Sequence, residues 1–332
     1  MTTVLITGAG GVATPGLIRR LCQQYDFRII AVDMDPHAIG LYWAHKGYMV
    51  PPGDSPDFPL VMRRICEQEQ VDVVVPLVDE ELLPALELES YGFKVLLPRR
   101  EFVRTCLNKL VLTRELAAVG VPVPSTRLAS DLSRTLHFPA IVKPIVGHGS
   151  RGVGIAYSAK DLVGIFYTSA LLDNLIVQSY IEGTEFTVSV VVDRSGRIHA
   201  VVPKEIVCKK DVTRIAITRH NDKIDAVCHK IQNSLNADGP FNVQLVMDKN
   251  TGLPTVFEIN PRFSTTTSLT TAAGIDEVGW LIQRALDPTC PELPDMWKEG
   301  VVLLRRTLDE FVDEEFMRGR TPVNLTGEDA VC

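Results

Sequence analysis

Residues 240–262 read PFNVQLVMDKNTGLPTVFEINPR, and this stretch carries the strongest structural signal in the chain. Two apolar segments, Phe241–Met247 and Thr255–Ile259, enclose the turn sequence Asn250-Thr251-Gly252. Apolar segments on either side of such a turn are typical of a β-hairpin. We therefore expect two neighbouring strands that present alternate side chains to the same face.

Polar side chains occupy every second position where the two strands approach each other. Asn242 and Gln244 share one face of the first strand, and Glu258 and Asn260 share one face of the second. A hairpin that is symmetric about its turn places Gln244 opposite Glu258 and Asn242 opposite Asn260. Burying such groups unpaired costs roughly 1–3 kcal/mol each. A hard cation such as Mg²⁺ takes oxygen ligands and shares its coordination with substrate phosphates, so it would explain the cluster.

The same pattern has a second interpretation, the polar outer face of an ordinary hairpin. The hairpin alone does not decide between the two. Arg262, directly after the second strand, favours the metal site, because a guanidinium group beside a metal is suited to binding carboxylate or phosphate.

A lysine ends the apolar strand Pro139–Pro144, ahead of a glycine-rich segment at Gly147–Gly154. Backbone N–H groups of such a flap can close over phosphate oxygens, while Lys143 supplies a positive charge. No Gly-Lys-Ser/Thr sequence follows, so this is not a Walker A loop. The alternative is a flexible hairpin tip with a solvated lysine. Lys109, in a predicted helix, is by itself no more informative than a surface lysine.

A third segment, Val177–Val188, joins two predicted strands through a bend that carries Glu182 and Glu185. Its backbone N–H and C=O groups can pair with the edge of an adenine ring, and a carboxylate can accept hydrogen bonds from ribose hydroxyls. The alternative is an exposed acidic turn.

The N-terminal residues alternate between strands and helices. Val4–Thr7 and Arg28–Asp33 read as buried strands, followed by Val71–Pro76 and Lys94–Leu97, with helical segments between them. This alternation predicts an α/β domain over residues 1–100, with a parallel sheet and helices on both faces.

Beyond this domain the pattern changes to longer strands of antiparallel character. Phe102–Val119 is expected to form one helix, stopped by Gly120. We expect an α+β domain over residues 101–332, with a smaller lid subdomain over about 122–182.

Composition and charge argue against several classes of protein. With 45% hydrophobic and 23% charged residues the chain has a globular balance, and no apolar run approaches the ~20 residues of a membrane-spanning helix. The net charge is −7 without a basic patch, which argues against nucleic-acid binding. Seven cysteines without a CxxC pair, and no signal peptide after Met1, favour reduced thiols in the cytoplasm.

In the order of its motifs the chain resembles the ATP-grasp enzymes, and most of all the carbamoyl-phosphate synthase large-subunit branch. The motifs are the Lys143 strand, the glycine-rich flap, Gln-x-Tyr-Ile-x-Gly-x-Glu at 178–185, Asn-x-Gln at 242–244 and Glu-x-Asn-Pro-Arg at 258–262. The first hundred residues resemble the Rossmann-like domain that precedes ATP-grasp in many of these proteins. The resemblance extends to about residue 285.

The resemblance implies a role for each motif. Lys143 and Arg262 would be catalytic, with Arg262 facing the γ-phosphate and the acyl group. Gln178 to Ile181 would form the adenine hinge, and Glu185 would bind the ribose. The residues implied to bind ATP are Lys109, Lys143, Gly149, Ser150, Gln178, Ser179, Tyr180, Ile181, Glu185, Gln244 and Glu258. Those implied to hold Mg²⁺, with Mn²⁺ as the alternative ion, are Gln244, Glu258 and Asn260.

The resemblance also implies an ATP-dependent ligase. A carboxylate would attack the γ-phosphate of ATP, and an amine would capture the acyl phosphate as an amide. The implied partners are small-molecule acids and amines, without nucleic acid or membrane, and a homodimer is one assembly open to the chain. Positioning and cancellation of phosphate charge would supply the catalysis. Two alternatives stay open: phosphorylation of bicarbonate or carbamate, and a regulator that binds ATP without turnover.

The chain departs from the family pattern at three places. The hinge often carries an acid where this chain has Ser179, and glycine often follows where this chain has Thr265–Ser268 after Ser264. The second change keeps the regulator open. The strand at 203–214 often presents arginines to the phosphates. The candidates for that role here are Lys204, Lys209, Lys210 and Arg214.

A different enzyme class competes for the first domain. Gly8–Ala13 satisfies the G-x-G-x-x-A pattern after the first strand, and Asp33 closes the second strand, as in a nicotinamide dinucleotide fold. The glycines can equally serve the tight turn alone. A dehydrogenase would leave the hairpin cluster and the flap unexplained.

Overall fold

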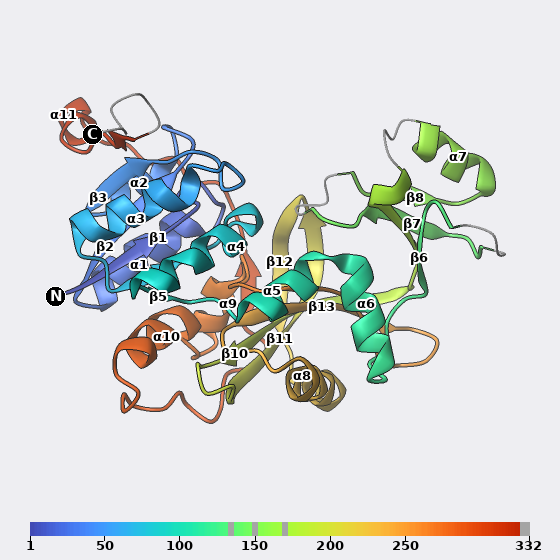
Figure 1. The fold of residues 1–332 in the computed structure, drawn as a ribbon. Coiled ribbons are helices and arrows are strands. Elements are labelled where there is room, and N and C mark those ends of the chain that lie inside the picture. Colours follow the sequence, from blue (N-terminus) through green and yellow to red (C-terminus); the bar gives the residue numbers. More distant parts are fainter. Residues whose placement is uncertain (132–135, 148–151, 168–171, 326–332) are drawn as a thin grey trace.

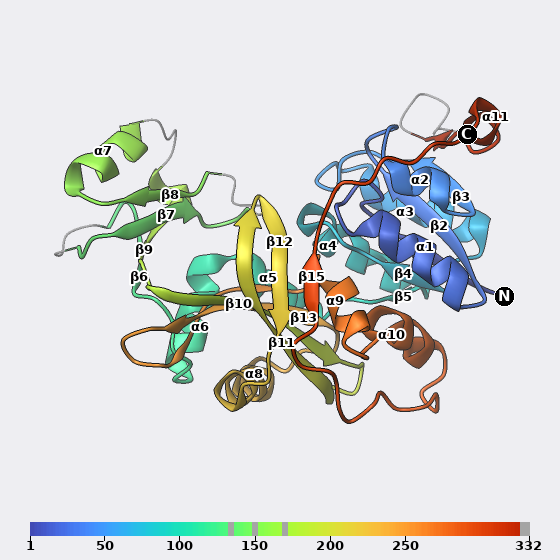
Figure 2. The same ribbon diagram turned by 180° about the vertical axis from the view of Figure 1, so that it is seen from behind.

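The structure is a computed structural model that describes residues 1–131, 136–147, 152–167 and 172–325. These residues contain three sheets, which Figure 1 and Figure 2 show as three neighbouring bodies. A parallel sheet lies at one end, a small lid sheet lies at the other, and a long antiparallel sheet lies between them. Every helix in the described part of the chain is too short or too polar to span a bilayer.

The N-terminal sheet is wholly parallel, with the strand order β16-β3-β2-β1-β4-β5. Its first strand sends alternate residues into opposite cores: Val4 and Ile6 pack with α1, whereas Leu5 packs with α3. Helices therefore cover both faces, which confirms the predicted α/β domain. Its elements are β1 (Thr2–Ile6), α1 (Thr14–Gln24), β2 (Phe27–Asp33), α2 (Ile39–Trp43), β3 (Lys46–Met49), α3 (Phe58–Glu69), β4 (Val73–Val75), η1 (Asp79–Glu81), α4 (Leu82–Ala85), η2 (Leu86–Tyr91) and β5 (Lys94–Val95).

Two helices follow this domain where the sequence predicted one. α5 (Arg100–Leu107) ends before Asn108, and α6 (Lys109–Ala118) begins after it. The Asn108 Oδ1 atom accepts hydrogen bonds from the N–H groups of Leu110 and Val111, so it caps a new helix instead of continuing the old one. The prediction of one helix over 102–119 was therefore wrong, and the break turns Lys109 into the first residue of α6.

The lid is an antiparallel sheet with the strand order β6-β9-β7-β8. Its small apolar core includes Ala140, Val142 and Val177 and is closed by α7. Its elements are β6 (Thr126–Leu128), β7 (Ala140–Pro144), β8 (Gly154–Ala156), α7 (Ala159–Tyr167), η3 (Leu172–Asn174) and β9 (Leu175–Ser179).

The central sheet is antiparallel, with the strand order β14-β13-β10-β11-β12-β15. One face packs against α5, α6 and α8 through residues such as Phe102, Leu116 and Ile224. Val191 and Val202 on the other face join the core of the N-terminal domain, so the two domains share buried surface. Its elements are β10 (Gly183–Val192), β11 (Ile198–Lys210), β12 (Val212–Thr218), α8 (Asp222–Leu235), β13 (Phe241–Asp248), β14 (Pro254–Asn260), α9 (Thr267–Ala272), α10 (Glu277–Leu286) and β15 (Val302–Leu304).

The last described residues return to the N-terminal domain. After β15, the chain passes α11 (Glu314–Arg318) and ends in β16 (Val323–Asn324), which pairs with β3. Figure 2 shows this segment running from the central sheet back to the N-terminal sheet. Sequence reasoning did not find β16, because a two-residue strand has no periodicity. The domain boundary near residue 100 and the lid limits stay predictions.

Candidate active site

A pocket of about 300 Å³ lies between the lid sheet and the hairpin of β13 and β14; we call it the lid pocket. It gathers residues that lie far apart in the sequence. Among those that line it are Lys109, Lys143, Gly147, Gln178, Ser179, Tyr180, Ile181, Glu185, Lys209, Gln244 and Glu258. Most of the residues predicted to bind ATP therefore meet in one place.

The hairpin has the predicted register. Gln244 lies opposite Glu258, and Asn242 lies opposite Asn260. The register shifts between Gln244 and Leu245, which is a β-bulge next to the polar pair. Directly opposed residues have Cβ atoms about 5 Å apart, so the Gln244 and Glu258 oxygens can approach one ion.

Asn242 does not belong to this oxygen cluster in the way predicted. Its amide is almost completely buried, and it donates hydrogen bonds of 2.8 Å to the Thr187 hydroxyl and 2.9 Å to the Val188 carbonyl. Its Oδ1 atom accepts from Thr187 at 3.0 Å. The amide is satisfied within the sheet, so Asn242 supports the hairpin instead of binding an ion.

The oxygens of Gln244, Glu258 and Asn260 suit Mg²⁺, which prefers carboxylate and carbonyl oxygens. In the described part of the chain, no group of three or more His, Cys, Asp or Glu residues could hold a metal alone. A site built from one carboxylate and two amides is therefore incomplete without further oxygens. That is the arrangement expected where substrate phosphates complete the coordination, so the residues fit the ion.

Lys143 on β7 is buried, and its Nζ atom lies 3.4 Å from the Phe257 carbonyl oxygen on β14. Burial lowers its pKa to about 8; the carboxylate of Glu258 opposes the shift, and Lys109 and Lys209 add to it. The Lys143 ammonium group thus lies near other positive charges, and a bound anion would reduce the repulsion among them.

Lys109 is not the surface lysine that its sequence context suggested. It is only 7% exposed, and its Nζ atom donates to the Gly147 carbonyl and lies 3.5 Å from Glu258 Oε1. The break at Asn108 sets the direction of the side chain. Lys109 therefore connects the start of the glycine-rich segment to the predicted metal ligand.

The connector after β9 offers a backbone donor to a ligand. The N–H groups of Ser179 and Tyr180 donate to the carbonyls of Ser125 and Pro139 at 2.9 and 3.2 Å. Among the described residues the N–H of Ile181 meets no acceptor. The Gln178 side chain donates to Thr126 Oγ1 at 2.8 Å and so connects strands β9 and β6 of the lid. Gln178 also lines the lid pocket.

Glu185 forms an ion pair with Lys209 at 2.6 Å at the edge of the lid pocket. Of the four basic candidates on the strand at 203–214, Lys209 is the one that lines this pocket. Two register irregularities, at Ile206/Cys208 and Cys208/Lys209, reset which side chains of β11 face the pocket. Sequence gives no signal for such bulges, so it could not single out Lys209.

Lys204, another of these candidates, is fully buried away from the lid pocket. Its Nζ atom donates to Ser189 Oγ at 2.7 Å and to Thr266 Oγ1 at 3.1 Å. Burial lowers its pKa to about 8, against the pull of the Glu277 carboxylate. It therefore anchors the segment after Ser264 and does not face the lid pocket.

Two residues of the predicted flap, Gly149 and Ser150, lie outside the described residues, as does His148 between Gly147 and Gly149. The flanks of the flap are described. Gly147 lines the lid pocket, and Gly152 has a φ of 68°, which favours glycine.

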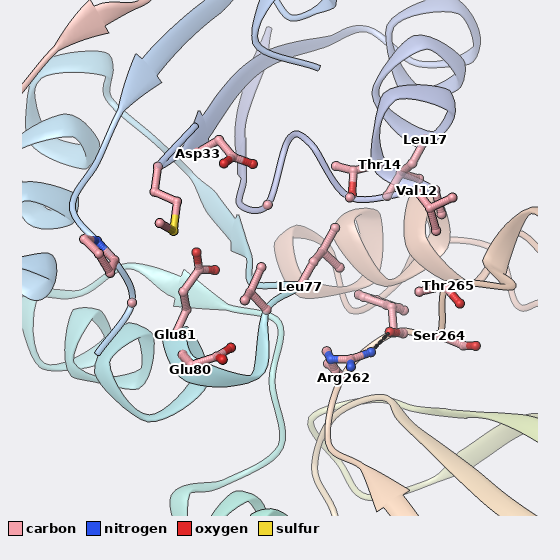
Figure 3. Close-up of a pocket in the computed structure, with 18 of the residues that line it drawn as sticks. Val12, Thr14, Leu17, Asp33, Leu77, Glu80, Glu81, Arg262, Ser264 and Thr265 are labelled. Carbon is pink, nitrogen blue, oxygen red and sulfur yellow. Dashed lines mark hydrogen bonds between the residues drawn. The ribbon is translucent and has the colours of Figure 1, made fainter. Parts of the chain in front are cut away.

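Arg262 joins the hairpin to the N-terminal domain. Its Nε atom lies 2.5 Å from Asp79 Oδ1, and its NH1 group donates to the Phe263 carbonyl at 3.1 Å. The side chain lines a second pocket, of about 430 Å³, which we call the N-terminal pocket. Figure 3 shows Arg262 on the side of this pocket that the residues after β14 provide.

A third cavity, of about 290 Å³, lies between the two pockets; we call it the middle cavity. It shares Lys109, Gly147 and Glu258 with the lid pocket, and Asp54 and Glu80 with the N-terminal pocket. The three therefore form a row, in which Glu258 lines both the lid pocket and the middle cavity, and Asn260 lines the middle cavity. Such a row can hold a phosphate donor at one end and an acceptor at the other.

Two family models match the chain. "PylC-like, N-terminal domain" matches residues 4–95, and "ATP-grasp in the biosynthetic pathway with Ter operon" matches residues 172–303. The carbamoyl phosphate synthase large chain of Xylella fastidiosa (strain Temecula1) is 26% identical over 325 residues, which cover 82% of this chain. This chain spans 28% of the length of that relative.

Solved structures show the same fold. The biotin carboxylase domain of Hydrogenobacter thermophilus 2-oxoglutarate carboxylase, solved as a dimer with MgADP, ADP and bicarbonate, matches with a TM-score of 0.75 and 16% identity over 89% of this chain and 72% of that chain. The L-amino acid ligase from Bacillus licheniformis matches with a TM-score of 0.68 and 18% identity over 86% of this chain and 74% of that chain. The predicted fold class, an α/β domain followed by an ATP-grasp fold, is confirmed.

Proposed function

We propose that this chain, which belongs to the ATP-grasp superfamily, is an ADP-forming ligase that joins a carboxylate to an amine through an acyl phosphate. The observation that carries the proposal is the hairpin register. It pairs Gln244 with Glu258 beneath Lys143 and Lys109, at the end of a row of cavities that leads to the N-terminal pocket. An oxygen cluster beside buried lysines suits a metal-bound polyphosphate better than it suits any uncharged ligand.

In this proposal the lid pocket binds ATP. The Ile181 N–H and the neighbouring carbonyls meet the adenine edge, and Glu185 lies where ribose hydroxyls would donate. Lys143 and Lys109 bind the phosphates under the glycine-rich flap, to which Gly149 and Ser150 belong. Gln244, Glu258 and Asn260 would hold Mg²⁺, or Mn²⁺ in its place, which supplies charge neutralisation on the phosphates.

The proposed reaction needs no covalent bond to the protein. A carboxylate oxygen attacks the γ-phosphorus, the bond to the β-phosphate oxygen breaks, and ADP leaves. The amine nitrogen then attacks the acyl carbon, inorganic phosphate leaves, and the nitrogen loses a proton. Arg262 stands beside the middle cavity, where its charge favours the carboxylate and the transferring phosphoryl group.

Phosphorylation of bicarbonate or carbamate is the second candidate. It is favoured by the name of the Xylella relative and by the bicarbonate in the Hydrogenobacter structure. The N-terminal pocket argues against it, because about 430 Å³ is far more room than a bicarbonate ion fills. The name of the L-amino acid ligase, whose fold this chain shares, supports amide formation.

A regulator that binds ATP without turnover is the third candidate. It was suggested by Thr265–Ser268, where the family often has glycine. Thr265 and Thr267 line the N-terminal pocket, and Thr266 accepts a hydrogen bond from Lys204. These hydroxyls contact the acceptor pocket and leave the lid pocket unchanged, which supports a change of acceptor specificity over a loss of turnover.

Hydroxylamine trapping tests the proposal. Purified protein, MgATP and hydroxylamine are incubated with a panel of small carboxylates, and both ADP and hydroxamate are measured. The proposal predicts equal amounts of ADP and hydroxamate with one class of acid. ADP release that needs only bicarbonate would favour the second candidate, and tight ATP binding without ADP from any acid would favour the regulator.

Two properties of the whole protein are proposed with the function. A homodimer is proposed because the Hydrogenobacter domain is a dimer, and sedimentation analysis would test it. A reducing cytoplasmic location is proposed because the described cysteines are all free thiols.

A further inference from the structure

The N-terminal pocket lies at the carboxyl ends of the parallel strands. Gly8 follows β1, Asp33 ends β2, Gly53 follows β3 and Leu77 follows β4, and all four residues line it. Ligands of open α/β sheets bind at this edge. Here the residues after β14 close the opposite side, so the pocket is formed by both domains (Figure 3).

Glu81 stands out within this pocket. It is only 6% exposed, and its Oε2 atom is buried without a hydrogen-bond partner among the described residues. The Thr7 side chain forms a hydrogen bond to the same carboxyl group. Gly53 lies directly against it, because a Cβ atom on Gly53 would be 2.4 Å from Glu81 Cγ. Because Glu81 lines the pocket, a donor group of a ligand can supply the partner that this carboxyl group lacks.

The surroundings of Glu81 are acidic. The carboxylate of Asp33 is fixed by the N–H groups of Gly10 and Asp35, at 2.7 and 2.9 Å. The titratable groups around the pocket are Asp33, Asp54, Glu80, Glu81 and Arg262, together with Asp79, which pairs with Arg262. Carboxyl groups thus outnumber the single guanidinium, and that guanidinium is already paired.

Burial raises the pKa of Glu81 to about 8; Thr7 opposes the shift, and the carboxylates of Asp33 and Glu80 add to it. The group is therefore largely neutral at pH 7 unless a cation lies beside it. A cation that replaced the missing partner would favour the ionised form and release a proton.

We infer that the N-terminal pocket binds a small molecule carrying both an ammonium group and a carboxylate, with the ammonium held by Glu81 and Asp33 and the carboxylate directed toward Arg262. This rests on the proposed function, because it gives the chemical class of the molecule that meets the acyl phosphate site. An ammonium group brings a positive charge and three N–H donors, which match an acidic wall and an oxygen without a partner.

The side of the N-terminal pocket formed by the residues after β14 suits the carboxylate of the inferred ligand. Arg262, Ser264 and Thr265 lie across the pocket from Asp33 and Glu81 in Figure 3. Apolar side chains of Val12, Leu17 and Leu77 also line the pocket. A zwitterion with a short aliphatic body therefore matches the pocket at both ends, with its carboxylate next to the middle cavity.

Calorimetric titration of the full chain tests the inference. The probes are common amino acids and ω-amino acids such as 5-aminopentanoate, each paired with the compound that has hydrogen in place of the ammonium, such as pentanoate. We expect the ammonium-bearing member of a pair to bind at least about tenfold more tightly. Its affinity should rise about tenfold per pH unit between pH 6 and 8, with close to one proton released at pH 7.

Glu81→Gln should weaken that binding at least about tenfold and remove its pH dependence. Glu87→Gln, at an exposed position of η2, is the matched control. It should change neither the affinity for the ammonium-bearing ligand nor the pH dependence of that affinity. Both variants should keep the ATP affinity of the original chain. If Glu81→Gln fails to fold, the inference is still tested by the pH dependence of ligand affinity in the original chain.

Equal binding of the paired compounds would overturn the inference. So would affinity that falls as pH rises, because a neutral Glu81 would then be donating to an uncharged ligand group. ATP binding without binding of any panel member at about 10 mM would overturn it as well. Absence of ATP binding would instead contradict the proposed function, since ammonium selectivity is measured without nucleotide.

Discussion

The lid pocket and the N-terminal pocket are built on opposite charge. Lys109, Lys143 and Lys209 line the first, whereas Asp33, Glu80 and Glu81 are among the groups that line the second. In each, burial works against a charged side chain: it lowers the pKa of Lys143 to about 8 and raises that of Glu81 to about 8. A ligand of opposite charge would stabilise the ionised form of each of these two groups, a polyphosphate beside Lys143 and an ammonium beside Glu81.

The largest loss of activity is expected from a substitution in the lid pocket. Glu258→Ala should reduce ADP release about 1000-fold, because it removes the only carboxylate among the proposed metal ligands and leaves Lys109 without its acidic partner. Initial rates at saturating acid and amine measure this. The matched control is Glu182→Ala, whose exposed carboxylate pairs with Lys249 outside the pocket and whose rate should stay within about twofold. Undiminished ADP release by Glu258→Ala would remove the metal assignment.

The second largest loss of activity is expected from replacing Arg262, whose side chain lies between the hairpin and the N-terminal domain. Arg262→Ala should lower kcat/KM for the carboxylate about 100-fold and leave KM for ATP within about threefold, because its side chain lines the N-terminal pocket and not the lid pocket. Steady-state kinetics with each substrate varied in turn separates the two constants. Arg197→Ala, an exposed position, is the control. If Arg262→Ala raised only the KM for ATP, Arg262 would contribute to nucleotide binding and not to binding of the carboxylate.

The two pockets should show opposite pH dependences of ligand binding. Lys143 has a lowered pKa, so its charge is present below about pH 8 and lost above it. ATP affinity should therefore fall by up to about tenfold per pH unit above pH 8, whereas ammonium binding beside Glu81 rises toward that pH. Titration of ATP between pH 6.5 and 9.5 measures this, and Lys143→Arg should flatten the curve, since arginine stays charged. A profile that Lys143→Arg leaves unaltered would contradict the assignment.

The smallest expected effect on activity concerns Asn242. Asn242→Ala should destabilise the fold by about 2 kcal/mol, because buried polar groups of Thr187 and Val188 lose their partner, yet ADP release should change less than about twofold. Urea unfolding followed by circular dichroism measures the first and the ADP assay the second. Asn233→Ala, on the exposed side of α8, should be nearly neutral. Loss of activity without loss of stability would return Asn242 to the metal site.

The difference between the pockets also explains what could be predicted from the sequence. The lid pocket is built around a hairpin, whose register follows from side-chain alternation and a turn. Gln244 and Glu258 could therefore be placed opposite each other, and the structure agrees. The bulge beside them has no local signal, and neither do the bulges in β11 that single out Lys209.

The N-terminal pocket could not be predicted in this way. Its residues follow four strands of the parallel sheet and β14 of the central sheet, so their meeting depends on the strand order of the first sheet and on how the second packs against it. Glu81 follows Val78-Asp79-Glu80, and nothing in that sequence shows that it is buried; in the structure it packs against Gly53 and is 6% exposed. Lys109 is an intermediate case. Asn108 before it is a recognisable N-cap residue, and reading it as such would have found the helix break.

The most direct test of the account is a crystal structure of the full chain with Mg²⁺ and a non-hydrolysable ATP analogue. We expect the nucleotide in the lid pocket, with Glu258 and Gln244 oxygens on the ion and Lys143 on the phosphates. A nucleotide bound in the N-terminal pocket, or hairpin side chains that leave the ion to water alone, would contradict it.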